Sequence, residues 1–215
     1  MTVLLAPTLA QLNYAKLMID GGFTNVFIAA MSVVAFATVI ERLINLRRGH
    51  LVSESLIATI RSQWENQPPA TFERYCTENG SVFARAAAFL SRNRTGNYSA
   101  VSTAVSDIAS IEIRRHQQRI YPLMLIASIA PLAGLFGTVI GIVETFNGVA
   151  ETGQAGNVSV LAGGIYKALS CTAAGLFVAI PALAFYHYFR MRLKSASILL
   201  EEGLNGLLND YLLRS

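Results

Sequence analysis

Charged residues are scarce in this chain: Asp, Glu, Lys and Arg together make up 14% of its 215 residues. An ordinary soluble domain carries about 25% charged residues, and its apolar share is about 45–50%. Here the apolar share is 53% and the mean hydropathy is positive. The shortage of charge therefore excludes an ordinary soluble domain and predicts a membrane protein.

Residues suited to metal, redox or covalent chemistry are also few and scattered. Cys76 and Cys171 stand alone, without the spacing of a zinc or redox site. The histidines His50, His116 and His187 are equally isolated, and no P-loop or nucleophile motif occurs. We therefore expect no enzyme, no metal site and no cofactor. We expect no nucleic-acid partner either, because the arginines behind the net charge of +4 cluster between and after the apolar segments, as in a protein oriented in a bilayer.

What the chain does have is long apolar runs. Tyr121–Val143 and Ala168–Tyr186 contain no formal charge. About 20 helical residues, rising 1.5 Å each, cross the roughly 30 Å hydrocarbon core of a bilayer, so each run predicts a transmembrane helix. We expect an all-α membrane protein with three transmembrane helices and long cytoplasmic helical extensions. Its predicted segments are an outer N-terminal segment (1–22), the first span (23–44), a cytoplasmic helical region (45–119), the second span (120–146), an outer connection (147–160), the third span (161–189) and a cytoplasmic C-terminal helix (190–215).

The basic residues predict the orientation of these spans. The large loop and the C-terminal tail are rich in arginine, whereas the short connection Asn147–Val160 has no basic residue and the N-terminal tail has only Lys16. Basic loops stay in the cytoplasm. We therefore expect the N-terminus and the short connection outside, and the large loop and the C-terminus inside.

The large loop itself is predicted to be helical. A helix is expected after Ser53–Ser55, ending at Pro68-Pro69, and a turn is expected at Arg94–Asn97. From Tyr98 onward apolar residues recur at helical spacing with no break before the membrane. The second transmembrane helix is thus expected to begin well inside the cytoplasm.

Hydroxyl groups inside the charge-free runs are the first functional candidates. Thr138 and Thr172 both lie roughly 15 Å from the outer edge at 1.5 Å per residue, and Ser170 is close by. A buried hydroxyl needs a partner. One reading is structural, with each hydroxyl bonded to a carbonyl of its own helix or to a neighbouring helix. The other is a pore-lining pair of hydroxyls on a proton pathway.

Two opposite charges lie nearer the outer edge. Glu144 and Lys167 are at similar depths, which suggests an intramembrane ion pair within or between subunits. The alternative is that Lys167 extends to the interface while Glu144 stays hydrated.

Small residues repeat every four positions on the second and third spans and predict close helix packing; the set includes Ala133, Gly137 and Gly141, and Gly175 and Ala179. Pro131 and Pro181 are expected to kink these helices.

These residues resemble a known family. The segment Ala130–Gly141, APLAGLFGTVIG, resembles the second-span signature of the MotA/TolQ/ExbB proton channel family, and Ala168–Pro181 is similar to its third span. Gly21-Gly22 and Ile40–Arg42, which flank the first span, also look like ExbB and TolQ members. The resemblance extends over nearly the whole chain, and three spans fit the ExbB and TolQ members rather than the four-span MotA type.

The resemblance implies a homopentamer in the cell inner membrane whose second and third spans line a pore. A single-span ExbD-like partner would bring an essential Asp into that pore, facing Thr138 and Thr172. Proton flow would then drive rotation, and a TonB-like protein would pass the force to outer-membrane import. The spans of this chain contain no Asp, so a partner's carboxylate fills a gap.

One position departs from the family pattern: well-known ExbB and TolQ members carry a glutamate where this chain has Lys167. A cation does not relay protons as a carboxylate does, so the resemblance does not assign that step of the implied pathway to Lys167. The alternatives to an ExbB-like motor subunit are a TolQ-like subunit for envelope constriction and a non-conducting membrane scaffold.

Overall fold

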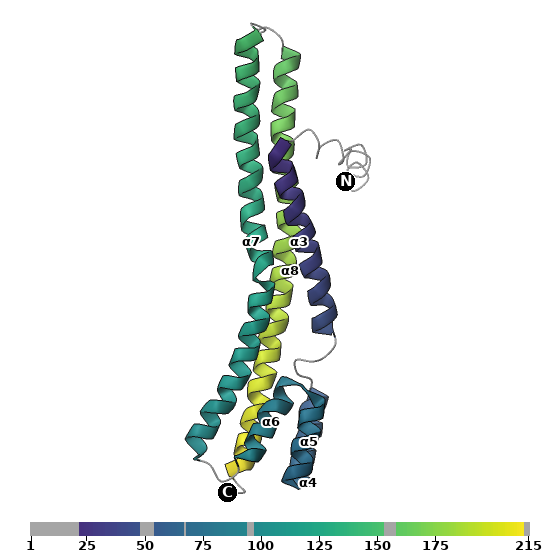
Figure 1. Cartoon of the computed structure of the whole chain (residues 1–215), viewed down its shortest axis with the longest axis vertical. Coiled ribbons are helices and arrows are strands. Elements are labelled where there is room, and N and C mark those ends of the chain that lie inside the picture. Colours follow the sequence, from purple (N-terminus) through teal and green to yellow (C-terminus); the bar gives the residue numbers. More distant parts are fainter. Residues whose placement is uncertain (1–21, 48–53, 67, 94–96, 153–157, 213–215) are drawn as a thin grey trace, which may run out of the picture. The chain divides into compact units, whose positions relative to one another are not determined.

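The computed structural model describes residues 22–47, 54–66, 68–93, 97–152 and 158–212. Every element in these ranges is an α-helix, which confirms the predicted all-α class: α3 (Gly22–Arg47), α4 (Glu54–Asn66), α5 (Pro69–Asn79), α6 (Val82–Arg92), α7 (Tyr98–Thr152) and α8 (Val158–Leu212) (Figure 1). The predicted N-terminal segment up to residue 21, His50 and the middle of the predicted connection (153–157) lie outside the described residues.

Three of the helices are long and apolar enough to cross a membrane, as predicted. The candidate spans are Phe23–Asn45 in α3, Tyr98–Glu151 in α7 and Val158–Asp210 in α8. Helix α7 continues to Thr152, and α8 already begins at Val158, so the predicted connection 147–160 is helical at both ends. Asn147 and Gly148 are weak helix formers just beyond residue 146, but an interior glycine costs only about 1 kcal/mol relative to alanine.

The chain divides into two compact units. The first, here called the spanning unit, holds α3 up to Val39, α7 from Pro122 and α8 up to Tyr186. The second, here called the bundle unit, holds Ile40–Arg47, helices α4 to α6, α7 up to Tyr121 and α8 from His187.

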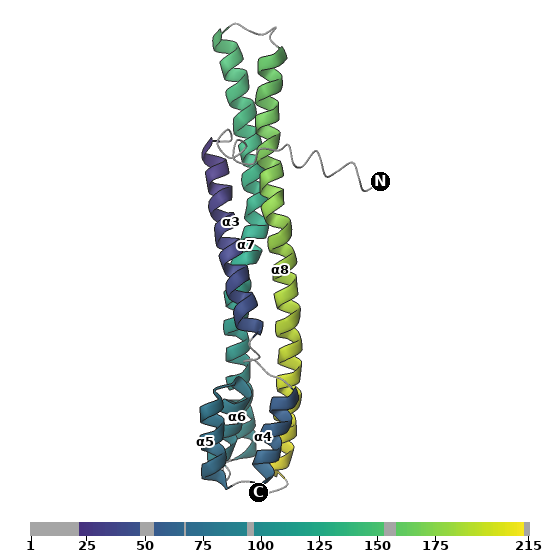
Figure 2. The ribbon, with the colours of Figure 1, turned by 90° about the vertical axis from the view of Figure 1, so that its right-hand side faces the viewer.

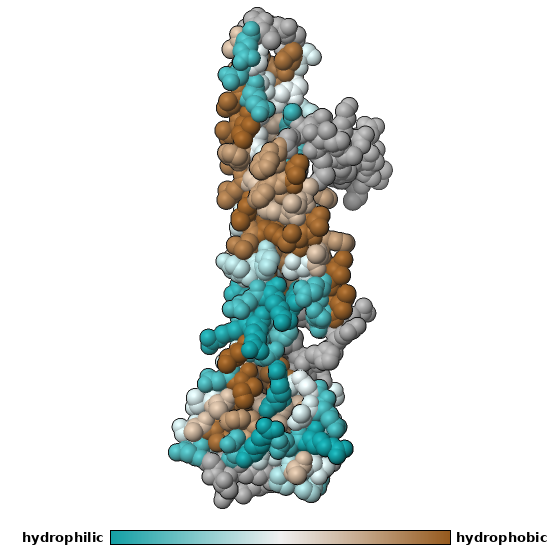
Figure 3. Space-filling view, viewed as in Figure 1, coloured by the Kyte–Doolittle hydropathy of each residue, from teal (hydrophilic) through white to brown (hydrophobic). Residues whose placement is uncertain are grey.

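In the spanning unit α7 and α8 lie side by side and antiparallel, with α3 along the pair (Figures 1 and 2). Helix α3 buries Thr24, Ile28, Ala35 and Val39, which recur at helical spacing on one face. Its other face is apolar and open, with Phe36 68% exposed. Much of the visible surface of the spanning unit is apolar (Figure 3). In water such a surface would be unfavourable, so it fits lipid or neighbouring helices.

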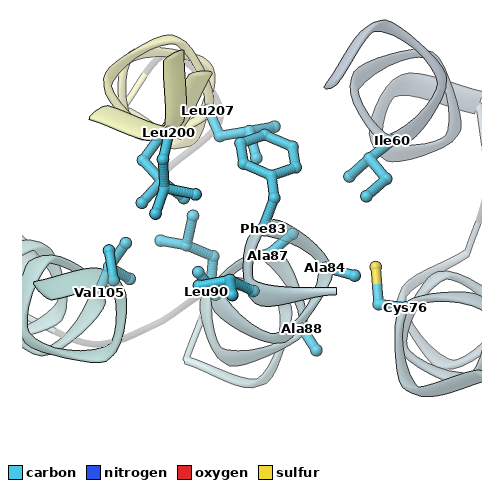
Figure 4. Packing of buried hydrophobic residues seen from close by; sticks show 14 of the residues in the cluster. Ile60, Cys76, Phe83, Ala84, Ala87, Ala88, Leu90, Val105, Leu200 and Leu207 are labelled. Atoms are coloured by element: carbon cyan, nitrogen blue, oxygen red, sulfur yellow. The ribbon is translucent and has the colours of Figure 1, made fainter. Parts of the chain in front are cut away.

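In the bundle unit α6 lies at the centre of the core. Its Phe83 and Leu90 are fully buried. Leu90 lies near Val105 of α7 and Leu200 of α8, and Phe83 points toward Leu207 of α8 (Figure 4). The alanines of α6 let neighbouring helices approach on several sides, and α4 and α5 contribute Ile60, Trp64, Phe72 and Cys76. Each large apolar side chain buried in this way contributes about 1.5–3 kcal/mol.

Helix ends in the bundle unit follow local chemistry. The break at Pro68-Pro69 and the start of α7 at Tyr98 are confirmed. A further break at Gly80-Ser81 was not predicted. Gly80 ends α5 with a φ of 66°, and the Ser81 hydroxyl caps α6 by accepting a hydrogen bond from the Ala84 N–H at 3.1 Å.

Candidate functional site

Helices α7 and α8 approach each other closely along a seam in the spanning unit. A methyl group built on Gly134 would lie 2.8 Å from the Cys171 carbonyl oxygen, and one on Gly175 would lie 2.5 Å from the Ala130 carbonyl oxygen. One on Gly141 would lie 3.1 Å from the Ala168 side chain. Only glycine lets the two backbones come this close. Because lipid gives helices no hydrophobic reason to associate, such packing is what holds membrane helices together.

Both candidate threonines lie at this seam. A methyl group on Gly134 would come within 3.0 Å of the Thr172 Cα, and Gly134 is one helical turn from Thr138. The levels of the two threonines therefore differ by no more than about one turn, roughly 5 Å.

The two hydroxyls have different surroundings. The Thr138 side chain is 8% exposed, and its hydroxyl donates a hydrogen bond to the Leu135 carbonyl oxygen at 2.7 Å. The Thr172 Oγ1 is buried and has no hydrogen-bond partner among the described residues. A buried hydroxyl without a partner costs about 1–3 kcal/mol. Thr172 is thus the seam residue most in need of a group from outside this chain.

Glu144 and Lys167 line one cavity of about 260 Å³ at the seam, in which Gly137, Gly141, Ala168 and Cys171 also take part. No salt bridge joins the two charges in the part of the chain that the structure describes. The structure thus brings the two predicted partners to one site, and their pairing stays a prediction.

The other predicted residues have mainly local surroundings. Ser170 is half-buried, and its hydroxyl donates to the Tyr166 carbonyl oxygen at 2.9 Å. Ala133 is half-buried and Ala179 is buried. Pro131 and Pro181 both lie inside continuous helices, so neither ends its helix.

Thr24 and Cys171 line the cavity but were not predicted from the sequence as site residues. Thr24 of the first span is 8% exposed and lines the cavity, and a methyl group on Gly137 would lie 2.9 Å from the Thr24 Cγ2. Cys171 lines it as well and is 3% exposed. A polar residue at the start of an apolar helix is a weak signal, and only the packing of three helices gives it a place in this site.

The bundle unit holds a second group of charges, on α3, α6 and α7. The Arg42 side chain is fully buried and pairs with Glu41, while its Nε and Nη1 have no hydrogen-bond partner among the described residues. Glu112 forms a salt bridge with Arg85 at 2.9 Å and lies 3.9 Å from His116 Nε2. Burial lowers the pKa of His116; Arg42 and Arg119 lower it further, and Glu112 opposes them.

Cys76 and the possible metal ligands among the described residues form no reactive site. Burial raises the pKa of the Cys76 thiol to about 12, so that thiol is unreactive at neutral pH. No group of three or more His, Cys, Asp or Glu side chains within the described ranges is placed to hold a metal ion.

Comparison with known proteins gives the same family as the seam residues do. Residues 78–202 match the model of the MotA/TolQ/ExbB proton channel family. The chain is 30% identical over 200 residues to the biopolymer transport protein ExbB of Neisseria meningitidis, covering 88% of this chain and 89% of that protein.

Shorter segments are more similar. The match to ExbB of Salmonella typhimurium is 48% identical over 73 residues, and it spans 34% of this chain and only 30% of that relative. The match to the Tol-Pal system protein TolQ of Pseudomonas aeruginosa is 39% identical over 97 residues, 43% of this chain and 42% of that protein. The chain therefore belongs to the MotA/TolQ/ExbB proton channel family, as a multi-pass protein of the cell inner membrane.

Proposed function

We propose that this chain is an ExbB-like motor subunit that conducts protons together with a single-span partner. Five copies surround the partner, which is ExbD-like and places an Asp beside the seam of α7 and α8. Proton flow drives rotation of the partner, and a TonB-like protein passes the force to transport across the outer membrane. The chain is not an enzyme in this proposal. The family and the ExbB relatives support it.

The observation that carries the proposal is the buried Thr172 hydroxyl. It lies at the seam against Gly134, near the level of Thr138, and it has no hydrogen-bond partner among the described residues. The three predicted spans contain no Asp. A carboxylate from a second polypeptide would satisfy the hydroxyl and supply a group that binds and releases protons.

The test is proton flux through liposomes that contain the chain and its ExbD-like partner. Thr172→Ala and Thr138→Ala are expected to leave assembly intact and to abolish flux and energised uptake. Ser128→Ala is the matched control, because the Ser128 hydroxyl is exposed and bonds only the Met124 carbonyl oxygen, at 3.0 Å, among the described residues. Wild-type flux in both threonine variants would contradict the assigned roles. Absence of flux in an assembled wild-type complex would instead favour a scaffold.

A TolQ-like role in a Tol envelope-constriction system is the second candidate, favoured by the similarity to TolQ over 97 residues. The two roles use the same seam and differ in the partner. Complementation separates them: we expect the chain to restore TonB-dependent uptake in a strain that lacks its own ExbB, and not to restore envelope constriction in a strain that lacks TolQ.

A further inference from the structure

The cavity that holds Glu144 and Lys167 extends along the seam toward the threonines. On α7 its lining residues Gly137, Ile140, Gly141 and Glu144 follow helical spacing, and so form one face of the helix. From Glu144 to Gly137 this face is about 10 Å long at 1.5 Å per residue. Gly137 directly precedes Thr138 in the chain. The cavity therefore has a charged end and an end at the level of Thr138.

The opposite wall follows the same course. On α8 the lining residues are Lys167, Ala168 and Cys171, which span one helical turn. Cys171 directly precedes Thr172. Phe23 and Thr24 of helix α3 line the third side. All three walls belong to one copy of the chain.

The cavity is large enough and polar enough for water. Its volume is about 260 Å³, whereas one water molecule occupies about 30 Å³ in the liquid. A buried water needs two to four polar partners. The Glu144 carboxylate on α7 and the Lys167 ammonium on α8 supply such partners from two of the three helices.

We propose that this cavity is the water-filled access to the threonine pair from the side of the short connection, and that Glu144 is its proton-relay residue. The Glu144 carboxylate accepts a proton from a hydronium ion at the charged end. The resulting carboxylic acid releases the proton to water farther along the cavity, which regenerates the carboxylate. The proton then passes to the partner's Asp, so this inference rests on the proposed function.

The charges of the two walls explain why Glu144 has this role in this chain. Glu144 on α7 and Lys167 on α8 are the two charged side chains among the described residues that line the cavity. A relay needs a carboxylate in the cavity, and α7 supplies it across the seam from the lysine. The Lys167 ammonium attracts the Glu144 carboxylate and keeps a hydrated, charged end on the cavity.

The first test is flux in liposomes that contain the chain and its single-span partner. Glu144→Gln is expected to lower flux at least tenfold, and Glu144→Asp to retain a measurable part of it. Glu151→Gln is the matched control, since Glu151 is an exposed carboxylate farther along α7 and does not line the cavity.

A rescue variant shows whether the loss of flux in Glu144→Gln comes from the missing proton relay or from a structural defect. In Glu144→Gln with Lys167→Glu the carboxylate returns to the cavity from α8, and we expect flux to recover. Wild-type flux in Glu144→Gln would overturn the relay. So would failure of the rescue variant, because the loss in Glu144→Gln would then have a structural cause.

The second test measures water access without any flux, so it separates this inference from the proposed function. In a Cys76→Ala background, a membrane-impermeant methanethiosulfonate reagent is expected to form a mixed disulfide with Cys171, with release of methanesulfinate. Ile140→Trp fills the cavity and should slow this labelling at least tenfold. Ile129→Trp should not, since Ile129 is exposed elsewhere on α7.

Two results would overturn the water-filled cavity: no labelling of Cys171 in the folded protein, or equal labelling rates in the two tryptophan variants. If the wild-type complex carries no flux while Cys171 is labelled through the cavity, the proposed motor function fails and the water access stands.

Discussion

At the scale of single residues, the hydroxyls of Thr138 and Thr172 differ in their hydrogen bonds, although both lie at the seam of α7 and α8. Thr138 donates a hydrogen bond to the Leu135 carbonyl oxygen of its own helix, at 2.7 Å. This is the purely structural role that the sequence allows for any threonine in a helix. Thr172 has no such bond in the described chain, although helices offer carbonyl groups in every turn. The hydroxyl that stays without a local bond is the better candidate for contact with a partner.

His116 gives a prediction about pH. Its pKa in the folded chain is lowered, first by burial and then by Arg42 and Arg119, against the opposing effect of Glu112. The unfolded chain therefore binds more protons between the folded pKa and the unfolded value of about 6.5. The stabilisation from a neutral His116 is present above about pH 6.5 and is lost as the pH falls through the folded pKa.

We expect the free energy of unfolding of the bundle unit to be lower at pH 5 than at pH 7.5, and His116→Gln to reduce this difference. The fluorescence of Trp64 is the measurement, since this residue is the single tryptophan and is 2% exposed in the bundle core. His187→Gln is the control, because His187 is exposed. An unchanged pH dependence in His116→Gln would show that other groups cause it.

At the scale of elements, the seam of α7 and α8 depends on a few glycines. We expect Gly134→Ala to destabilise the spanning unit by about 1–3 kcal/mol, because its methyl group would lie 2.8 Å from the backbone oxygen of Cys171 and the helices must move apart. The measurement is the midpoint of thermal unfolding in detergent.

Gly148→Ala is the matched control on the same helix. No atom lies within 4 Å of its added methyl group, and alanine favours a helix by about 1 kcal/mol over glycine. Gly148→Ala should therefore be neutral or stabilising. Equal losses of stability in the two variants would mean that Gly134 is not needed for the close packing of α7 against α8.

The turn between α5 and α6 gives a second prediction at this scale. Gly80 has a φ of 66°, and nothing lies within 4 Å of a methyl group placed on it. The cost of Gly80→Ala is thus conformational, about 1 kcal/mol. Gly80→Asn should cost less, because asparagine tolerates the left-handed region. Trp64 fluorescence during denaturation measures both, and an asparagine variant as unstable as the alanine variant would argue against this cause.

How far the elements could be predicted depended on the kind of signal. Charge-free runs and the prolines at 68 and 69 mark spans and breaks locally, so these predictions hold. The break at Gly80 was missed because one glycine is a weak signal among helix-forming neighbours. The cavity needed three helices to be brought together, and the place of Thr24 and Cys171 in it follows from packing that no local pattern contains.

At the scale of the whole molecule, the distribution of basic residues predicts the orientation of the spans in the membrane. The packing of the helices does not test this orientation. The described loop helices and the end of α8 are rich in arginine, with Arg190, Arg192 and Lys194 directly after the predicted third span. The predicted connection 147–160 has no basic residue. Basic segments remain in the cytoplasm. The end of α8 should therefore lie in the cytoplasm and its start on the other side of the membrane.

Labelling of single cysteines with a membrane-impermeant maleimide tests this orientation in a Cys76→Ala, Cys171→Ala background. Ser159→Cys, near the start of α8, should react in intact spheroplasts, and Ser195→Cys should react only after the membrane is permeabilised. Both positions are exposed on one helix, so permeabilised cells provide the reference rate for each. The opposite pattern would place the short connection in the cytoplasm. The cavity at Glu144 would then open to the cytoplasm, and protons moving down their usual gradient would leave through it rather than enter.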